Sequence, residues 1–167
     1  PMAACPHSPD AVCDVSELAG KKVDQVCIGS CTNSSYLDLM RAARILKGRH
    51  VADGVSLVVS PGSRQVLSMI AENGALNDLL CAGARLLECA CGPCIGMGQA
   101  PGTDAVSLRT FNRNFKGRTG TVSANVYLVS PETAAASAVT GVVTDPRTLS
   151  PEIDLAVELP DVFPADD

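Results

Sequence analysis

The sequence is poor in aromatic residues (3%), has no tryptophan and holds only two histidines. It contains no apolar run that approaches the roughly 20 residues of a membrane span, and no basic-then-apolar signal peptide at its start. Positive charge is also scarce, since 13 Lys and Arg stand against 18 Asp and Glu, for a net charge of −5. We therefore expect neither a membrane nor nucleic acid as the main partner. With 46% hydrophobic residues in a chain of 167, the composition argues against disorder and fits one domain with a core.

Cysteine, by contrast, is abundant, with eight copies. A disulfide framework is typical of small secreted proteins, whereas a chain of this length has enough apolar residues to build a core without one. We expect reduced thiols in the cytoplasm, some of them buried and some bound to metal. Cys27 and Cys81 lie in apolar runs and are expected in the core. No role is assigned to Cys5, Cys13 or Cys89.

Apolar runs alternate with helix signals along the chain and predict an α/β fold. Strands are expected at about 23–28, 55–59, 85–89, 105–111 and 124–129, and helices at about 35–47, 63–74, 76–81 and 131–140. The clearest helix start is Ser130-Pro131-Glu132, an N-cap followed by proline and an acid. Continuous apolar strands separated by helices predict a three-layer αβα domain with a mostly parallel sheet and helices on both faces.

Composition divides the chain into three parts. Residues 1–20 show no strong periodicity and are expected to be an entering segment. Residues 21–149 carry the alternating pattern of the α/β domain. Residues 150–167 are acidic and rich in proline, which is typical of a linker.

Three cysteines follow predicted strands at points where α/β proteins place their sites. Cys31 lies between a strand and a helix, where free backbone N–H groups favour a thiolate. Cys91 and Cys94 stand in a Cys-Gly-Pro-Cys loop, and this spacing lets both sulfurs reach one metal or cluster. Three thiolates meeting there would leave one metal position open for Lewis-acid chemistry. A thioredoxin-like redox dithiol uses the same four residues, so the spacing alone leaves both alternatives open.

A second motif, at 111–118, combines arginines and a lysine with amides and glycine after a predicted strand. Arg113 and Arg118 could bind carboxylates through bidentate contacts, and a solvated surface turn is the alternative interpretation. Arg64, His7 and His50 are interpreted as ordinary surface or loop residues.

Four strings together resemble the aconitase family of iron–sulfur hydro-lyases: VCIGSCTNSS (26–35), ACGPCIGMG (90–98), RTFNRNFKGR (109–118) and VYLVSPETAAASAVTG (126–141). They occur in the family's order and cover most of residues 22–147. The exact residues of these motifs, including PGSRQVL and CGPCIGMGQAP, look most similar to bacterial single-chain aconitate hydratases. The 3-isopropylmalate dehydratases and homoaconitases are the alternatives.

The resemblance implies a 4Fe–4S cluster held by three thiolates, namely Cys31, Cys91 and Cys94. It places Asn112 near the cluster and assigns Arg113 and Arg118 to binding a tricarboxylate substrate. The implied reaction is the interconversion of citrate and isocitrate through cis-aconitate, a step of the tricarboxylic acid cycle.

Family enzymes are several times longer than this chain, and their other catalytic residues come from other domains. The chain therefore looks like the third domain with the start of a linker, and the remaining domains of a parent enzyme are its expected partners. We expect the chain alone to be inactive and its cluster to be absent from some preparations. Binding of RNA by an apo form is a third alternative, which the negative charge does not favour.

Overall fold

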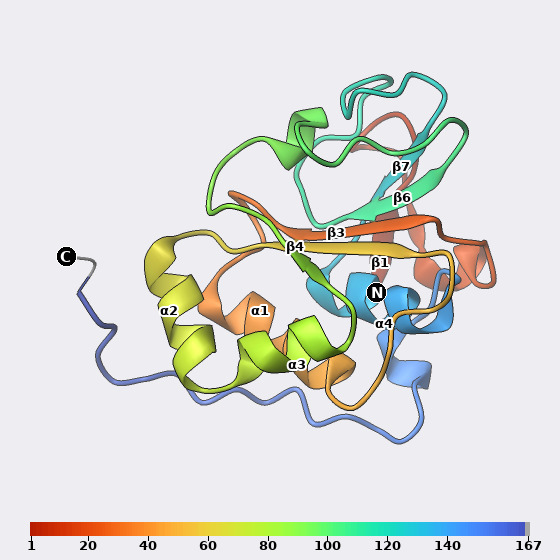
Figure 1. The fold of residues 1–167 in the computed structure, drawn as a ribbon. Helices are drawn as coiled ribbons and strands as arrows, with labels where there is room; N and C mark the ends of the chain where they lie inside the picture. Colours follow the sequence, from red (N-terminus) through yellow and green to blue (C-terminus); the bar gives the residue numbers. More distant parts are fainter. Residues whose placement is uncertain (166–167) are drawn as a thin grey trace.

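One seven-stranded sheet organises the computed structural model, which describes residues 1–165 (Figure 1). The strands are β1 (Met2–Ala4), β2 (Val12–Asp14), β3 (Gln25–Gly29), β4 (Ser56–Ser60), β5 (Arg85–Leu86), β6 (Val106–Arg109) and β7 (Asn125–Leu128), in the order β2-β1-β7-β6-β3-β4-β5. The five strands from β7 to β5 pair in parallel, and β1 joins β2 and β7 antiparallel. The predicted α/β class and mostly parallel sheet are confirmed.

Serine residues begin three of the four α-helices. The helices are α1 (Tyr36–Leu46), α2 (Arg64–Glu72), α3 (Ala75–Cys81) and α4 (Pro131–Thr140). The side chains of Ser35, Ser63 and Ser130 each accept a hydrogen bond from a backbone N–H in the first turn of α1, α2 and α4, which stabilises the helix start. The predicted start at residue 130 is thus confirmed. Short 3-10 helices cover Val15–Leu18, Pro93–Ile95 and Pro146–Thr148.

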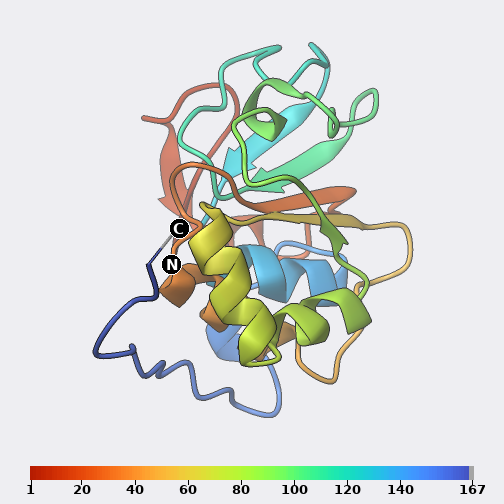
Figure 2. The same cartoon turned by 60° about the vertical axis from the view of Figure 1, so that its left-hand side comes forward.

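The four α-helices gather on one face of the sheet in both views (Figures 1 and 2). Helices were expected on both faces, but the second face is covered by loops and the short helix Pro93–Ile95. From the neighbouring strands β3 and β6, the chain continues toward β4 and β5 on one side and toward β7 on the other. Right-handed connections that run in opposite directions cross opposite faces. The β6–β7 connection therefore covers the second face, and it is a loop.

Side chains alternate between the two faces along the strands. Val26 and Ile28 of β3 point into the large apolar core beneath the helices. Cys27 between them packs with Val58 on the other face, together with Cys94 and a nearby phenylalanine. The sheet thus separates a large core under the helices from a small cluster under the loops.

Both ends of the described chain pack on this domain. The predicted entering segment 1–20 contains β1 and β2, which extend the sheet where Ala4 pairs with Leu128. Residues 150–165 form no helix or strand and run along the helix layer (Figure 1), where Ile153 and Leu155 pack against the core. Residues 166–167 of the predicted linker lie outside the described residues. No helix within 1–165 combines the length and the apolar character that a membrane crossing requires.

Candidate functional site

The predicted site residues gather around the carboxyl ends of β3 and β6, where the chain connections leave in opposite directions. This is the position at which open α/β sheets bind their ligands. The backbone N–H of Gly29, the last residue of β3, donates to Oγ1 of Thr110 at 2.8 Å. The Asn33 side chain donates to the carbonyl of the same threonine. The two strand ends are therefore tied together, and the loops that follow them begin side by side.

The turn that presents Cys31 depends on a close approach between two backbones. Gly29 has a φ of +110°, and a Cβ there would lie 2.0 Å from the carbonyl oxygen of Ser60. Ser30 follows with a φ of 68°, and its N–H donates to the same carbonyl at 2.8 Å. Only glycine fits the first of these positions without moving β4. The turn leaves the Cys31 side chain exposed at the strand end.

The Cys-Gly-Pro-Cys loop brings its two sulfurs together. The Sγ atoms of Cys91 and Cys94 lie 3.5 Å apart, with Cys91 exposed and Cys94 buried against Cys27 and Val58. Gly96 packs this loop onto the next one, since a Cβ there would lie 2.2 Å from the carbonyl oxygen of Thr119. The cysteine loop therefore rests directly on the loop that carries the predicted anion-binding arginines.

Three neighbouring groups shift the pKa of the Cys91 thiol. The pKa of the Cys91 thiol is raised, first by its hydrogen bond with Cys94 and then by repulsion from the thiolate forms of Cys94 and Cys31. The guanidinium of Arg118 acts in the opposite direction. Cys31, Cys94 and Arg118 thus all act on Cys91. The raised pKa favours the protonated form of this thiol.

Arg109 positions the cysteine loop, and the sequence analysis did not single it out. Its side chain is fully buried, and Nη1 donates to the carbonyl of Pro93 at 2.6 Å. Nη2 donates to the carbonyl of Gln99 at 3.0 Å and to Oε1 of Gln25 at 2.8 Å. Burial lowers the pKa of this guanidinium. Arg109 therefore fixes both ends of the segment from Pro93 to Gln99, and the available signal was a single charge inside an apolar strand run.

The 111–118 loop holds its predicted residues in different environments. Asn112 and Arg113 are exposed. Arg118 is half-buried, and its Nε is buried without a hydrogen-bond partner among the described residues. Asn114 anchors the loop, because its Nδ2 donates to the carbonyl of Cys5 at 2.8 Å. A buried donor without a partner is uncommon in folded proteins.

The donor set has the chemistry of an iron–sulfur site. Cysteine thiolates are the usual ligands of such clusters, and the structure offers a thiol pair with a third thiol acting on it. Over residues 1–165, however, no three His, Cys, Asp or Glu side chains are already grouped as a metal site. The assignment of Cys31, Cys91 and Cys94 as ligands stays a prediction, and binding requires the Cys91–Cys94 hydrogen bond to open.

The remaining cysteines differ in burial. Cys27 is buried as predicted, and burial raises the pKa of its thiol to about 11. The prediction for Cys81 is wrong, because this residue is exposed at the end of α3. Leu79 is buried on the same helix, and residues two positions apart on a helix do not share a face. Cys89 is half-buried.

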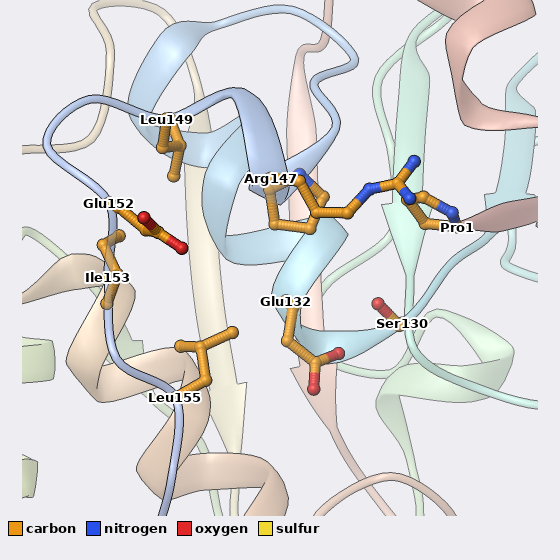
Figure 3. A pocket seen from close by; sticks show the side chains of 9 residues that line it. Pro1, Ser130, Glu132, Arg147, Leu149, Glu152, Ile153 and Leu155 are labelled. Carbon is orange, nitrogen blue, oxygen red and sulfur yellow. The ribbon is translucent and has the colours of Figure 1, made fainter.

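A cavity of about 390 Å³ lies away from the predicted site residues. Figure 3 shows Leu149, Ile153 and Leu155 of the C-terminal segment on one side and Glu132 of α4 on the other. None of the predicted thiols, amides or arginines lines it. The cavity belongs to the packing of the C-terminal segment, and the candidate site remains at the strand ends.

The family model for "Aconitase family (aconitate hydratase)" matches residues 8–141. A 3-isopropylmalate dehydratase large subunit of Archaeoglobus fulgidus is 48% identical over 148 residues, which are 88% of this chain and 36% of that protein. The homoaconitase large subunit of Thermus thermophilus is 50% identical over 155 residues, 91% of this chain and 37% of that protein. A 3-isopropylmalate dehydratase large subunit of Herpetosiphon aurantiacus is 46% identical over 160 residues, 94% of this chain and 38% of that protein.

These relatives revise one expectation from the sequence. The residues of the motifs predicted a similarity to single-chain aconitate hydratases. The relatives described above are instead large subunits of 3-isopropylmalate dehydratase and homoaconitase. The comparison therefore supports the alternative interpretation better, and it gives no specific support to a role in the tricarboxylic acid cycle. The chain spans somewhat more than a third of the length of these relatives.

Proposed function

The chain belongs to the aconitase family, and we propose that it is the cluster-binding region of a hydro-lyase large subunit. The proposed reaction is the reversible removal of water from a hydroxy acid of the 3-isopropylmalate or homoaconitate type. The names of the relatives favour these acids over citrate. A complementary subunit and the rest of the large subunit are the proposed partners, since the chain matches only part of each relative.

Members of the family bind a 4Fe–4S cluster, and we assign its ligands here to Cys31, Cys91 and Cys94. The 3.5 Å separation of the Cys91 and Cys94 sulfurs and the charge effect of Cys31 on Cys91 support this assignment. The three thiols must lose their protons to bind, because the thiolate is the ligand. We place the protein in the cytoplasm, where stable disulfides are rare. When bound, a cluster with one iron free of protein ligands supplies a Lewis acid that polarises the substrate hydroxyl.

Arg118 is the proposed anchor for a substrate carboxylate. Its buried Nε has no partner among residues 1–165, and its charge acts on Cys91. An arginine in this position can hold a carboxylate through two parallel hydrogen bonds and fix its orientation. Arg113 and Asn112 are exposed on the same loop and would meet the remaining polar groups of the substrate. The observation that carries the proposal is this joint placement of the thiol pair and Arg118.

The test is cluster reconstitution with iron and sulfide under anaerobic conditions. We expect the wild-type chain to take up iron and acid-labile sulfide with the visible absorption of a 4Fe–4S cluster. Cys31→Ser, Cys91→Ser and Cys94→Ser should each lose most of this uptake. Cys81→Ser is the matched control, because it removes an exposed thiol at the end of α3.

Equal loading of Cys31→Ser and the wild type would show that the ligand set is wrong. The redox-dithiol alternative instead predicts that the wild type takes up no cluster and that Cys31→Ser leaves the Cys91–Cys94 dithiol intact.

A further inference from the structure

Cys5 and Cys13 form a second thiol pair, at the opposite edge of the sheet from β5. The Sγ atoms of the two residues lie 3.0 Å apart, and both side chains are half-buried. Cys13 belongs to β2, while Cys5 follows the last residue of β1. The backbone N–H of Cys5 donates to the carbonyl of Ala11 at 2.7 Å, so both cysteines belong to one β-hairpin. The cluster ligands proposed above use neither thiol.

We propose that Cys5 and Cys13 are a disulfide-forming site that reacts with low-molecular-weight disulfides such as glutathione disulfide. The sulfurs need to approach by only about 1 Å to reach a disulfide bond length. Cys5 lies beyond the paired residues of β1, and only its N–H bond to the carbonyl of Ala11 continues the hairpin there, so this adjustment leaves the register of β1 and β2 intact. Formation of this disulfide does not depend on the proposed hydro-lyase function.

The reaction is a thiol–disulfide exchange in two steps. The Cys5 thiolate attacks one sulfur of glutathione disulfide, the S–S bond of the oxidant breaks, and one glutathione thiolate leaves. The Cys13 thiolate then attacks the Cys5 sulfur in the mixed disulfide and releases the second glutathione. Two protein thiols are oxidised, one disulfide is reduced to two thiols, and the two thiol protons end on the released glutathiones.

The surroundings decide the order of these steps. The pKa of the Cys13 thiol is raised to about 11, first by its hydrogen bond with Cys5 and further by burial and nearby negative charge, including that of Glu17 and Asp14. Cys13 therefore keeps its proton while Cys5 is a free thiol, and Cys5 reacts first. Once Cys5 carries glutathione, the Cys13 sulfur beside it resolves the mixed disulfide in an intramolecular step.

The disulfide would fasten the segment that supports the anion-binding loop. Nδ2 of Asn114 donates to the carbonyl of Cys5, and Phe115 forms a β-bridge with His7. Arg113 and Arg118 are carried by this same loop. Closing the hairpin at Cys5 removes freedom from the backbone on which Asn114 rests.

Tryptic mapping tests the site directly. Lys21 is the first basic residue that trypsin can use, so peptide 1–21 holds Cys5 and Cys13 and no other cysteine. The reduced chain is treated with glutathione disulfide, alkylated in denaturant and digested. We expect peptide 1–21 to lose two hydrogens and to carry no alkyl group. In Cys13→Ser, Cys5 should instead accumulate a mixed disulfide with glutathione, while Cys81→Ser should oxidise peptide 1–21 as the wild type does.

Hydrogen exchange tests whether the disulfide restrains the loop that carries Arg113 and Arg118. We expect amide exchange in residues 2–14 and 114–118 to slow severalfold on oxidation in the wild type and to stay unchanged in Cys13→Ser. The disulfide site is overturned if peptide 1–21 keeps two alkylated thiols under conditions that attach glutathione to the exposed Cys81. The link to the anion-binding loop is overturned if the disulfide forms and exchange in 114–118 does not change.

Discussion

The two faces of the sheet are covered by different kinds of side chains and are stabilised by different contacts. Under the helices, the core is mainly apolar, and α4 contributes buried alanines such as Ala134 and Ala138. Under the loops, a small cluster of apolar groups surrounds the fully buried guanidinium of Arg109, whose Cζ lies 5.4 Å from the centre of the Phe111 ring. Burial of apolar surface stabilises the first face, whereas hydrogen bonds from the Arg109 guanidinium stabilise the second.

This difference separates stability from chemistry in the fold. Helices on one face satisfy their own backbone groups, so apolar side chains are enough to hold them. The loops on the other face have carbonyls without regular partners, and Arg109 supplies donors to two of them. Arg109 thus holds both ends of the segment from Pro93 to Gln99. A change on the helix face should alter the free energy of unfolding, whereas a change in Arg109 should also alter the cysteines.

Leu39→Ala should have the largest effect, on stability alone. Leu39 of α1 is fully buried in the core, and truncation of such a leucine costs about 2–5 kcal/mol through lost burial and the cavity left behind. Urea denaturation followed by circular dichroism measures the loss. In the folded fraction, the alkylation rate of Cys91 should match that of the wild type.

Leu80→Ala is the matched control for this variant, because Leu80 of α3 is 46% exposed. Its cost should be below about 1 kcal/mol, as for other surface changes. A change in Cys91 reactivity in folded Leu39→Ala would show that the two faces are coupled and would break the comparison.

Arg109→Lys should cost less stability but change the cysteine loop. Lysine keeps the charge and cannot reproduce the planar fork that reaches Pro93 and Gln99 together. One buried carbonyl loses its donor, at a cost of about 1–3 kcal/mol. We expect the buried Cys94 to be alkylated faster than the measured global unfolding accounts for. Rates of alkylation at several urea concentrations separate local opening from global unfolding.

Arg49→Lys is the control on the helix side. Nη1 of Arg49 donates to a single carbonyl, that of Ile45, at 3.0 Å, and lysine can make one such bond. Cys94 should react in this variant as in the wild type. If Arg109→Lys left Cys94 equally protected, the cysteine loop would be held by its own turns and not by the buried guanidinium.

Sequence patterns were sufficient for the regular part of the fold. Apolar runs mark the central strands β3 and β4, and Ser35, Ser63 and Ser130 mark the helix starts, so local chemistry decides these elements. The strands β1 and β2 were missed, because three residues in a segment with three prolines show no period. The one-sided helix layer was also missed, since the face that a connection crosses depends on strand order, which the local pattern does not contain.

The site was predicted in part for a similar reason. Spacing and flanking strands pointed to Cys31, Cys91 and Cys94, and the structure pairs the last two. Arg109 was missed because a charge inside an apolar run has no partner visible in the sequence, and its partners lie in the cysteine loop and in β3. The sequence analysis favoured aconitate hydratases over the other enzymes of the family. The motifs did not distinguish them, because they lie around the proposed cluster ligands, and the relatives share that cluster chemistry.

The smallest expected effect concerns Asp24, at the edge of the sheet where β3 and β6 begin. Its carboxylate accepts a hydrogen bond from the N–H of Val106 at 2.9 Å and pairs with Lys22, and these contacts lower the pKa of Asp24 below its ordinary 3.8. A lowered pKa means that the folded state binds the proton more weakly than the unfolded state. The carboxylate therefore adds stability above its ordinary pKa, and this contribution is lost as the pH falls through the folded pKa.

Asp24→Asn keeps a neutral acceptor for Val106 and removes only the charge. Because the side chain is 34% exposed, solvent screening limits the difference from the wild type to at most about 1 kcal/mol. Urea denaturation at a series of pH values should show a constant difference near neutral pH that shrinks below the ordinary pKa. Asp53→Asn, in an exposed loop, should show a smaller difference at every pH. A difference for Asp24→Asn that persists in acid would assign the effect to lost packing, and the start of β3 would then resemble the helix face, held by burial and not by charge.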